Sequence, residues 1–246
     1  MDLGITGKRA AVAASSGGLG LGVARALAEA GCRVVMNGRD PDRLADAAAT
    51  VDGAIGIPGD VGTEAGAVGF VEGASDQLGG IDILVTNAGG PPAGTFATTP
   101  LTAYPGALEL NLLSAVAMCH RAVPGMRERG WGRVLAITSI SVRQPIGNLI
   151  LSNTARAGLT GFLKTLATEV APDGVTVNSL QPGLHATDRL QALGADLDQM
   201  AQGVPTRTIG DPDDFGRVAA FLCSESARFI TGAALPVDGG SYPGLL

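Results

Sequence analysis

The chain has 246 residues, 46% of them hydrophobic and 16% charged, which suits one α/β domain with a core of its own. Its net charge is −6 and it contains no run of Lys or Arg, which excludes nucleic acid as its main partner. The three cysteines, Cys32, Cys119 and Cys223, stand in apolar stretches without metal-ligand spacing, so we expect reduced thiols and no metal site.

Strand-like and helix-like segments alternate along the whole chain. The predicted strands are Ala10–Ala14, Arg33–Asn37, Ala54–Pro58, Ile81–Thr86, Val134–Ile137, Val175–Leu180 and Ala234–Val237. The predicted helices are Leu19–Ala30, Pro41–Thr50, Glu64–Leu78, Pro105–Met126, Asn148–Val170 and Asp211–Leu222. Alternation of this kind predicts a parallel sheet with helices on both faces. Because no linker divides the chain, we expect one α/β domain over residues 1–246, a doubly wound Rossmann domain with seven parallel strands.

The uncharged stretch 83–108 contains four prolines and four glycines, which indicates a loop and not a membrane helix. The start of the chain has no signal-peptide pattern, so we expect a cytoplasmic protein without a membrane partner. Ligands bind such sheets beyond the carboxyl ends of the strands, where the strand order reverses. The loop Gly90–Pro100 and the segment Leu184–Val204 are therefore expected to form a pocket for a small-molecule substrate.

A glycine-rich turn follows the first predicted strand and opens a helix. Glycines there let the backbone approach a pyrophosphate, and the helix N-terminus favours the negative charge. The turn resembles the Thr-Gly-x-x-x-Gly-x-Gly motif of the short-chain dehydrogenase/reductase family. Gly18 and Gly20 match the last two glycines of that motif, whereas Ala13 and Ala14 replace its Thr and its first Gly.

The resemblance continues in order along the chain, over residues 7–240, and is closest to the 3-oxoacyl-ACP reductases. Its further motifs are Gly59-Asp60-Val61, Thr86-Asn87-Ala88-Gly89, Asn111, Pro182-Gly183-x-x-x-Thr187 and Val237-Asp238-Gly239-Gly240. The resemblance implies a nicotinamide cofactor. The residues expected to bind it are Ser15, Ser16, Gly18, Leu19, Gly20, Arg39, Asp60, Val61, Asn87, Ala88, Gly89, Pro182, Gly183 and Thr187.

The end of the second strand indicates which cofactor is bound. NAD sites place a carboxylate there for the adenosine ribose, but this chain has Gly38 at that position, followed by Arg39. A guanidinium can bind a 2′-phosphate through two hydrogen bonds. The alternative is a surface arginine that pairs with Asp40 or Asp42. We favour the phosphate role and predict NADP(H).

The catalytic motif of the family is only half present. Members of the family use Asn, Ser, Tyr and Lys, and Arg156 with the following Ala-Gly-Leu occupies the place of their Lys-Ala-Gly-Leu. Ser152 therefore stands where the family has Tyr, while Ser139 and Asn111 match its Ser and Asn. A serine hydroxyl is a far weaker acid than a phenol, and a guanidinium stays charged. The usual proton exchange is therefore expected to be impaired.

Other side chains in the predicted site leave alternatives open. His185 follows Pro182-Gly183 and could supply the lost acid, or it could be an exposed loop residue. Arg143 either binds an anionic group on the substrate side or is a surface residue. His120 lies in a long apolar helix and is expected to be structural. The candidate catalytic residues are thus Ser139, Asn111, Ser152, Arg156 and His185.

These features favour an NADP(H)-dependent oxidoreductase-like protein with an atypical site, acting on a small carbonyl or alcohol. One alternative is a non-redox enzyme (a lyase, isomerase or cyclase) that retains its cofactor. Another is a catalytically silent, NADP-binding regulator. The helices Pro105–Met126 and Asn148–Val170 resemble the pair that forms the main interface of the family, so we expect a dimer or tetramer.

Overall fold

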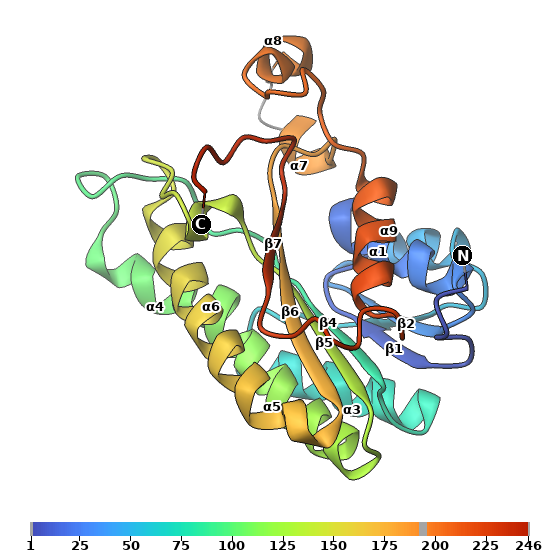
Figure 1. Cartoon of the computed structure of the whole chain (residues 1–246). Coiled ribbons are helices and arrows are strands. Elements are labelled where there is room, and N and C mark those ends of the chain that lie inside the picture. The colour runs from blue at the N-terminus through green and yellow to red at the C-terminus, as the bar shows by residue number, and fades with distance from the viewer. Residues whose placement is uncertain (1, 192–195, 246) are drawn as a thin grey trace.

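A parallel sheet of seven strands forms the centre of the molecule, for which a computed structural model describes residues 2–191 and 196–245 (Figure 1). The strand order is β3-β2-β1-β4-β5-β6-β7, and all neighbours pair in parallel. The strands are β1 (Arg9–Val12), β2 (Arg33–Gly38), β3 (Ile55–Pro58), β4 (Ile83–Thr86), β5 (Gly132–Ile137), β6 (Val175–Pro182) and β7 (Ala234–Val237). The predicted fold class is therefore confirmed.

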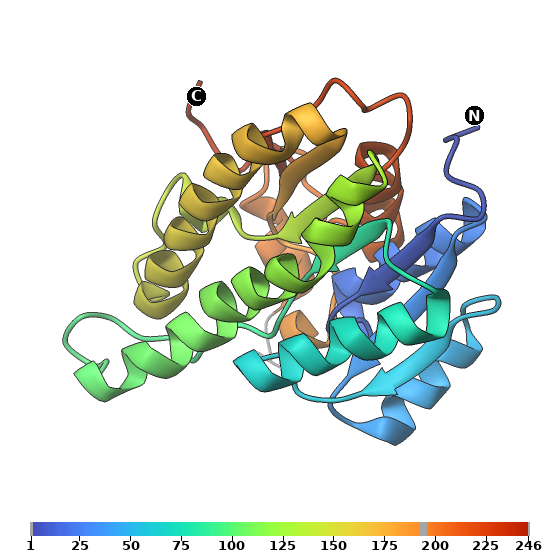
Figure 2. The ribbon, with the colours of Figure 1, turned by 90° about the horizontal axis from the view of Figure 1, so that it is seen from below.

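Two layers of helices cover the sheet, as Figures 1 and 2 show from two directions. One face packs against α3 (Glu64–Leu78), α5 (Ser114–Glu128) and α6 (Ile150–Val170). The other face packs against α1 (Gly18–Glu29), α2 (Pro41–Ala49) and α9 (Pro212–Leu222). Each layer has its own apolar core, with Met126 fully buried in one and Leu27 in the other. Burying a side chain of this size contributes roughly 1.5–3 kcal/mol.

The helix predicted over Pro105–Met126 is not a regular α-helix. A 3-10 turn, η1 (Leu101–Ala103), leads into α4 (Tyr104–Leu108), and a π-helical turn, η2 (Glu109–Leu113), separates α4 from α5. The apolar pattern predicts the helix but does not reveal the π-turn. Such turns occur often at functional sites, and this one carries Asn111.

The segment Leu184–Val204, expected to form part of the substrate pocket, contains two short helices that the sequence did not predict, and its residues 192–195 lie outside the described part of the chain. They are α7 (Asp188–Gln191) and α8 (Leu197–Gln202). The carboxylate of Asp196 accepts hydrogen bonds from the backbone N–H groups of Asp198 and Gln199, which caps α8. Two further 3-10 turns, η3 (Ile140–Val142) and η4 (Ala171–Asp173), precede and follow α6.

The three cysteines are free and buried, which confirms the expected reduced thiols. Burial raises the pKa of Cys119 and of Cys223 to about 12, so both thiols are protonated and unreactive at neutral pH. In the part of the chain that the structure describes, no group of three or more His, Cys, Asp or Glu side chains could hold a metal ion. None of the described helices has the length and apolar character to cross a membrane.

Candidate cofactor site and catalytic region

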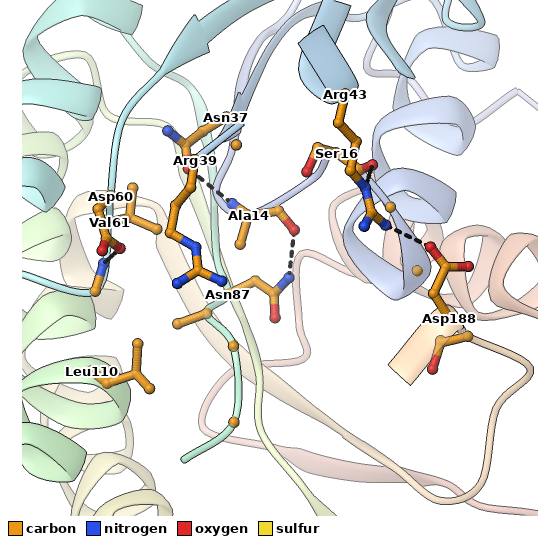
Figure 3. Close-up of a pocket in the computed structure, with 18 residues that line it drawn as sticks. Ala14, Ser16, Asn37, Arg39, Arg43, Asp60, Val61, Asn87, Leu110 and Asp188 are labelled. Carbon is orange, nitrogen blue, oxygen red and sulfur yellow. Dashed lines mark hydrogen bonds and ion pairs between the residues drawn. The ribbon is translucent and has the colours of Figure 1, made fainter. Parts of the chain in front are cut away.

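A cavity of about 530 Å³ opens at the carboxyl ends of β1, β2, β3 and β4 (Figure 3). This is where the strand order reverses, because the chain runs outward from β1 to β3 on one side and from β4 to β7 on the other. The cavity is lined by Ala14, Ser16, Gly17, Gly18, Asn37, Gly38, Arg39, Arg43, Asp60, Val61, Gly62, Asn87, Ala88, Gly89, Gly90, Leu110, Thr187 and Asp188. It therefore gathers residues from the glycine-rich turn, from the segments after β2, β3 and β4, and Thr187.

The glycine-rich turn is held in a tight conformation between β1 and α1. Ala14 has φ 46° and Gly18 has φ 55°, both in the left-handed region that favours glycine. A Cβ on Gly20 would lie 2.5 Å from the carbonyl oxygen of Ala14, so only glycine lets the helix approach the turn this closely. Asn87 at the end of β4 donates from Nδ2 to the same oxygen at 3.0 Å. The turn is thus fixed against the strand beside it.

Five of the residues that we expected to bind the cofactor do not line the cavity. Ser15 is a correction: it is fully buried, and its Oγ donates to the Val12 carbonyl at 2.8 Å and accepts from the Asn37 N–H at 3.1 Å. Its hydroxyl is therefore engaged between β1 and β2 and does not face the cavity. The other expected residues that do not line the cavity are Leu19, Gly20, Pro182 and Gly183.

Asn37 is a site residue that the sequence analysis missed. Its side chain is buried, and Nδ2 donates to the carbonyls of Ile57 and Gly59 at 3.0 and 3.1 Å. Its Oδ1 accepts from the Ala14 N–H at 3.3 Å. One amide therefore joins the ends of β1, β2 and β3 behind the cavity. An asparagine at the end of an otherwise apolar strand was the signal available in the sequence.

Two arginines reach the cavity from the end of β2 and the start of α2 (Figure 3). Arg39 is exposed, and among residues 2–191 and 196–245 it forms no hydrogen bond or ion pair. Asp40 instead caps α2 through the N–H groups of Asp42 and Arg43. Arg43, which the sequence analysis also missed, forms an ion pair with Asp188 at 2.6 Å. A basic residue in the first turn of a helix is unfavourable to the helix dipole. The position of Arg43 in the first turn of α2 was therefore the sign in the sequence of a role outside the helix.

Asn111 links the π-turn to the cofactor cavity. Its side chain is buried, and Nδ2 donates to the Gly89 carbonyl at 2.8 Å. Within the described residues, neither Asn111 Oδ1 nor Thr86 Oγ1 has a hydrogen-bond partner. Both residues line a second, very small cavity of about 10 Å³ that also touches Arg156. Its size matches about one water molecule.

The remaining residues that match the family's catalytic motif lie at the end of β5 and on α6. Ser139 is half-buried at the end of β5, and its Oγ accepts from the Ser141 N–H at 3.1 Å. Ser152 and Arg156 lie one turn apart on α6, and both are 8% exposed. Arg156 donates from Nη1 to the Ile137 carbonyl at 2.9 Å. The guanidinium is thus held against the end of β5, and it does not line the cofactor cavity.

His185 is not the exposed loop residue that we considered. It is 7% exposed, its ring packs edge-on against Phe215 at 5.1 Å between centroids, and Nδ1 lies 3.3 Å from the Gly183 carbonyl. Burial lowers its pKa, so the ring is neutral at pH 7. It lines a separate cavity of about 230 Å³ that shares no lining residue with the cofactor cavity. The other histidine, His120, which we expected to be structural, is exposed on α5 and lies outside the core.

Arg143 has a different role from the two that we considered. Its Nε donates to Gln181 Oε1 at 2.8 Å and its Nη2 to the Ala234 carbonyl at 2.7 Å. The guanidinium also lies 5.4 Å from the centre of the Tyr242 ring. Arg143 therefore joins the segment after β5 to β6, to β7 and to the C-terminal residues, which leaves it little capacity for a ligand.

The parallel sheet, the glycine-rich turn and the cavity where the strand order reverses define a dinucleotide-binding Rossmann domain. A family profile described as Enoyl-(Acyl carrier protein) reductase matches residues 13–242. The chain belongs to the short-chain dehydrogenase/reductase family, and the relatives described next are oxidoreductases.

Relatives of known structure or function cover almost the whole chain. Dehydrogenase/reductase SDR family member 4 of Sus scrofa is 36% identical over 242 residues, covering 95% of this chain and 87% of the relative. The 3-oxoacyl-[acyl-carrier-protein] reductase of Aquifex aeolicus is 31% identical, covering 98% of this chain and all of the relative. L-sorbose reductase of Gluconobacter frateurii, solved with NADPH and L-sorbose, matches with a TM-score of 0.94 and 35% identity over 100% of both chains. A 7α-hydroxysteroid dehydrogenase solved with NADH matches with a TM-score of 0.92 and 28% identity, over 100% of this chain and 98% of that one.

Proposed function

We propose that this chain binds NADP(H) in the 530 Å³ cavity and acts as an oxidoreductase on a small carbonyl or alcohol, with an atypical proton-transfer centre. The observation that carries the cofactor assignment is Arg39, an exposed guanidinium on the cavity wall beside Gly38, where an NAD site would have a carboxylate. A phosphate group is the natural partner of such a guanidinium.

The residues around the cavity fit a dinucleotide with two phosphate regions. The N-terminus of α1, opened by Gly17 and Gly18, offers backbone N–H groups and a favourable dipole for a pyrophosphate. Asp60 and Val61 after β3 suit the adenine end, as the family resemblance implies. When bound, the nicotinamide supplies or accepts a hydride. Arg39 would bind the 2′-phosphate that distinguishes NADP(H) from NAD(H).

On the catalytic side, Ser139 is the residue suited to hold a substrate oxygen, because it is half-buried at the end of β5. Ser152 cannot replace a phenol as an acid, and Arg156 holds its proton at all physiological pH values. We therefore propose that the proton is exchanged with water near Ser139, at a rate well below that of relatives that keep the Tyr. His185 is left out of this centre because it lines the separate cavity.

The assignment is tested by measuring the dissociation constants of NADPH and NADH for the parent and for Arg39→Ala. A charge-assisted hydrogen bond contributes about 1.5–3 kcal/mol, so we expect the dissociation constant of NADPH to rise about 10- to 150-fold. That of NADH should change less than about twofold. Arg121→Ala, on the exposed surface of α5, is the matched control and should leave both constants unchanged. Equal NADPH binding by Arg39→Ala and the parent would contradict the proposal.

Turnover separates this function from the alternatives. Oxidation of NADPH with an activated diketone supports the oxidoreductase, even at a low rate. Tight NADPH binding without turnover of any carbonyl or alcohol favours the silent regulator, a reading that the inward position of Arg156 also supports. Conversion of a substrate without consumption of the cofactor would favour the non-redox enzyme.

We also propose that the chain forms a dimer or tetramer in the cytoplasm. The outer faces of α5 and α6 form a groove of about 410 Å³, and its apolar lining includes Val123, Phe162 and Leu166. Apolar surface of this kind is typical of an interface. Light scattering that finds a 24.6 kDa particle at micromolar concentration would contradict the oligomer.

A further inference from the structure

A second guanidinium lies on the cofactor cavity, and unlike Arg39 it already has an anionic partner. Arg43 Nη2 is 2.6 Å from Asp188 Oδ2, so the pair joins the first turn of α2 to α7 (Figure 3). The two side chains are 53% and 73% exposed. An ion pair this exposed stabilises a protein little, because water and salt screen it. Arg43 is therefore held in place but remains free to exchange its partner.

Ser16 places Arg43 next to the position that distinguishes the two cofactors. Arg43 Nε donates to the Ser16 carbonyl at 3.3 Å, so the guanidinium lies over the glycine-rich turn. On its other side, Ser16 is in contact with the end of β2, since a Cβ on Gly38 would lie 2.8 Å from Ser16 Oγ. In space, Ser16 therefore lies between Arg43 and Gly38, and Arg39 follows Gly38 along the chain. A phosphate at Ser16 would have one arginine on each side.

Asp188 brings a negative charge to the same wall of the cavity. A phosphate that enters there meets this carboxylate, and the repulsion is cancelled only while Arg43 pairs with it. A phosphate dianion offers three oxygens and stronger charge-assisted hydrogen bonds than a monovalent carboxylate. The phosphate is therefore the better partner for Arg43 once it is present.

We propose that Arg43 exchanges Asp188 for the 2′-phosphate of NADP(H), so that Arg39 and Arg43 together bind this phosphate while Asp188 competes with it. This inference rests on the proposed function, namely that the cavity takes NADP(H). Arg43 is then a second determinant of cofactor specificity, and Asp188 lowers the affinity for NADP(H) while it leaves that for NAD(H) almost unchanged.

Three variants test the exchange by titration calorimetry with NADPH and with NADH. Arg43→Gln should weaken NADPH binding by about tenfold or more, because a charge-assisted contact is lost. Asp188→Asn should tighten NADPH binding by up to about fivefold, which is the range for loss of an exposed ion pair. The double variant should bind NADPH somewhat more tightly than Arg43→Gln alone, because it also lacks the unpaired carboxylate that repels the phosphate. All three should bind NADH within about twofold of the parent.

Glu72→Gln is the matched control, since it breaks an ion pair of similar exposure between Glu72 and Arg121, 2.7 Å apart and distant from the cavity. It should change neither constant. If Arg43→Gln weakens NADPH and NADH equally, Arg43 binds the pyrophosphate and the exchange is overturned. If the parent binds NADPH and Asp188→Asn binds it with the same affinity, the proposed exchange is overturned as well. A parent that binds neither cofactor overturns the proposed function itself.

Discussion

The two halves of the site differ in how much they offer to a ligand. At the ends of β1 to β4, a 530 Å³ cavity presents glycine backbone and the exposed Arg39. At β5 and α6, Ser152 and Arg156 are buried, and the cavity beside Arg156 measures only about 10 Å³. The first region offers an open cavity to a ligand, whereas in the second Arg156 is bonded to the Ile137 carbonyl and the space beside it is very small.

Under the proposed function, cofactor binding and proton transfer depend on separate elements of the fold. The cofactor cavity draws its residues mainly from β1, β2, β3 and β4, and the acid–base motif stands on α6. We therefore expect Ser152 and Arg156, which stand where the family has Tyr and Lys, to change the chemistry without disturbing the glycine-rich turn. Four predictions test whether the two regions are independent.

The largest effect is expected from restoring the family's pair through Ser152→Tyr with Arg156→Lys. Both positions lie on the same face of α6, one turn apart. A placed acid–base group contributes about 10²–10⁴-fold in rate, so turnover of an activated diketone should rise by that factor over the parent. The measurement is loss of NADPH absorbance, with the affinity for NADPH unchanged.

The single variants are the controls for that experiment. Tyr beside Arg156 lacks the amine that tunes it, and Lys beside Ser152 has no acid to tune, so neither should exceed the parent by more than about tenfold. A double variant that folds, binds NADPH and stays silent would show that the carbonyl cannot reach the nicotinamide. The non-redox alternative would then be preferred.

A second test disturbs the binding region alone, through Gly20→Ala. The new Cβ would lie 2.5 Å from a backbone oxygen, so we expect the free energy of unfolding to fall by about 1–3 kcal/mol and NADPH binding to weaken. Gly69→Ala in α3 is the control, because a Cβ there meets nothing within 4 Å. It should raise stability by up to about 1 kcal/mol. Equal behaviour of the two variants in urea unfolding would refute the close approach.

A smaller gain is expected where the chain departs from the family's glycine. Ala14 sits at φ 46°, which costs an L-residue about 1–2 kcal/mol, whereas glycine adopts it freely. Glycine also gains about 0.5–1 kcal/mol of freedom in the unfolded chain. Ala14→Gly should therefore raise the free energy of unfolding by about 0.5 kcal/mol. A decrease in urea unfolding would mean that the methyl contributes more by packing than the turn loses by strain.

The smallest effect concerns pH and the separate cavity of His185. Burial lowers the pKa of His185 below its ordinary value of 6.5, so the unfolded chain takes up the proton first as the pH falls. The contribution of the neutral ring is complete above pH 6.5 and is lost progressively below it. His185→Leu should therefore flatten the fall in unfolding free energy between about pH 7 and pH 5. If the unfolding free energies of the variant and the parent fall in parallel with pH, protonation of His185 does not contribute to the pH dependence of stability.

The sequence predicted the sheet well because buried parallel strands leave a strong local signal. All seven strands lie where their apolar runs indicated, and β4 begins at Ile83 and not at Ile81. The cavity-lining residues Asp60 and Asn87 were predicted for a similar reason, since each lies within two residues of the end of a strand. The carboxyl ends of parallel strands lie at the same edge of the sheet, independent of how the helices are arranged.

What the sequence did not predict depends on contacts between distant segments. His185 is buried against Phe215 on α9, which lies 30 residues further along the chain. Arg43 enters the site through Asp188, which is 145 residues away. The short helix α7 has too few residues for a periodic pattern. Ser15 was misjudged because its hydroxyl bonds to β1 and β2, which only the folded turn reveals.

The π-helical turn at Glu109–Leu113 interrupts the regular α-helical hydrogen bonding between α4 and α5. A turn closed by i→i+5 hydrogen bonds holds one residue more than an α-helical turn. Deleting Leu112 would allow an unbroken α-helix from Tyr104 to Glu128, with better backbone bonding throughout. It would also rotate Asn111 by about 100° relative to α5, away from the Gly89 carbonyl. The extra residue of the π-turn thus sets the rotation of α4 relative to α5, so that each segment faces its own neighbours. A continuous α-helix would lose the Asn111–Gly89 hydrogen bond, which joins the loop after β4 to this helix.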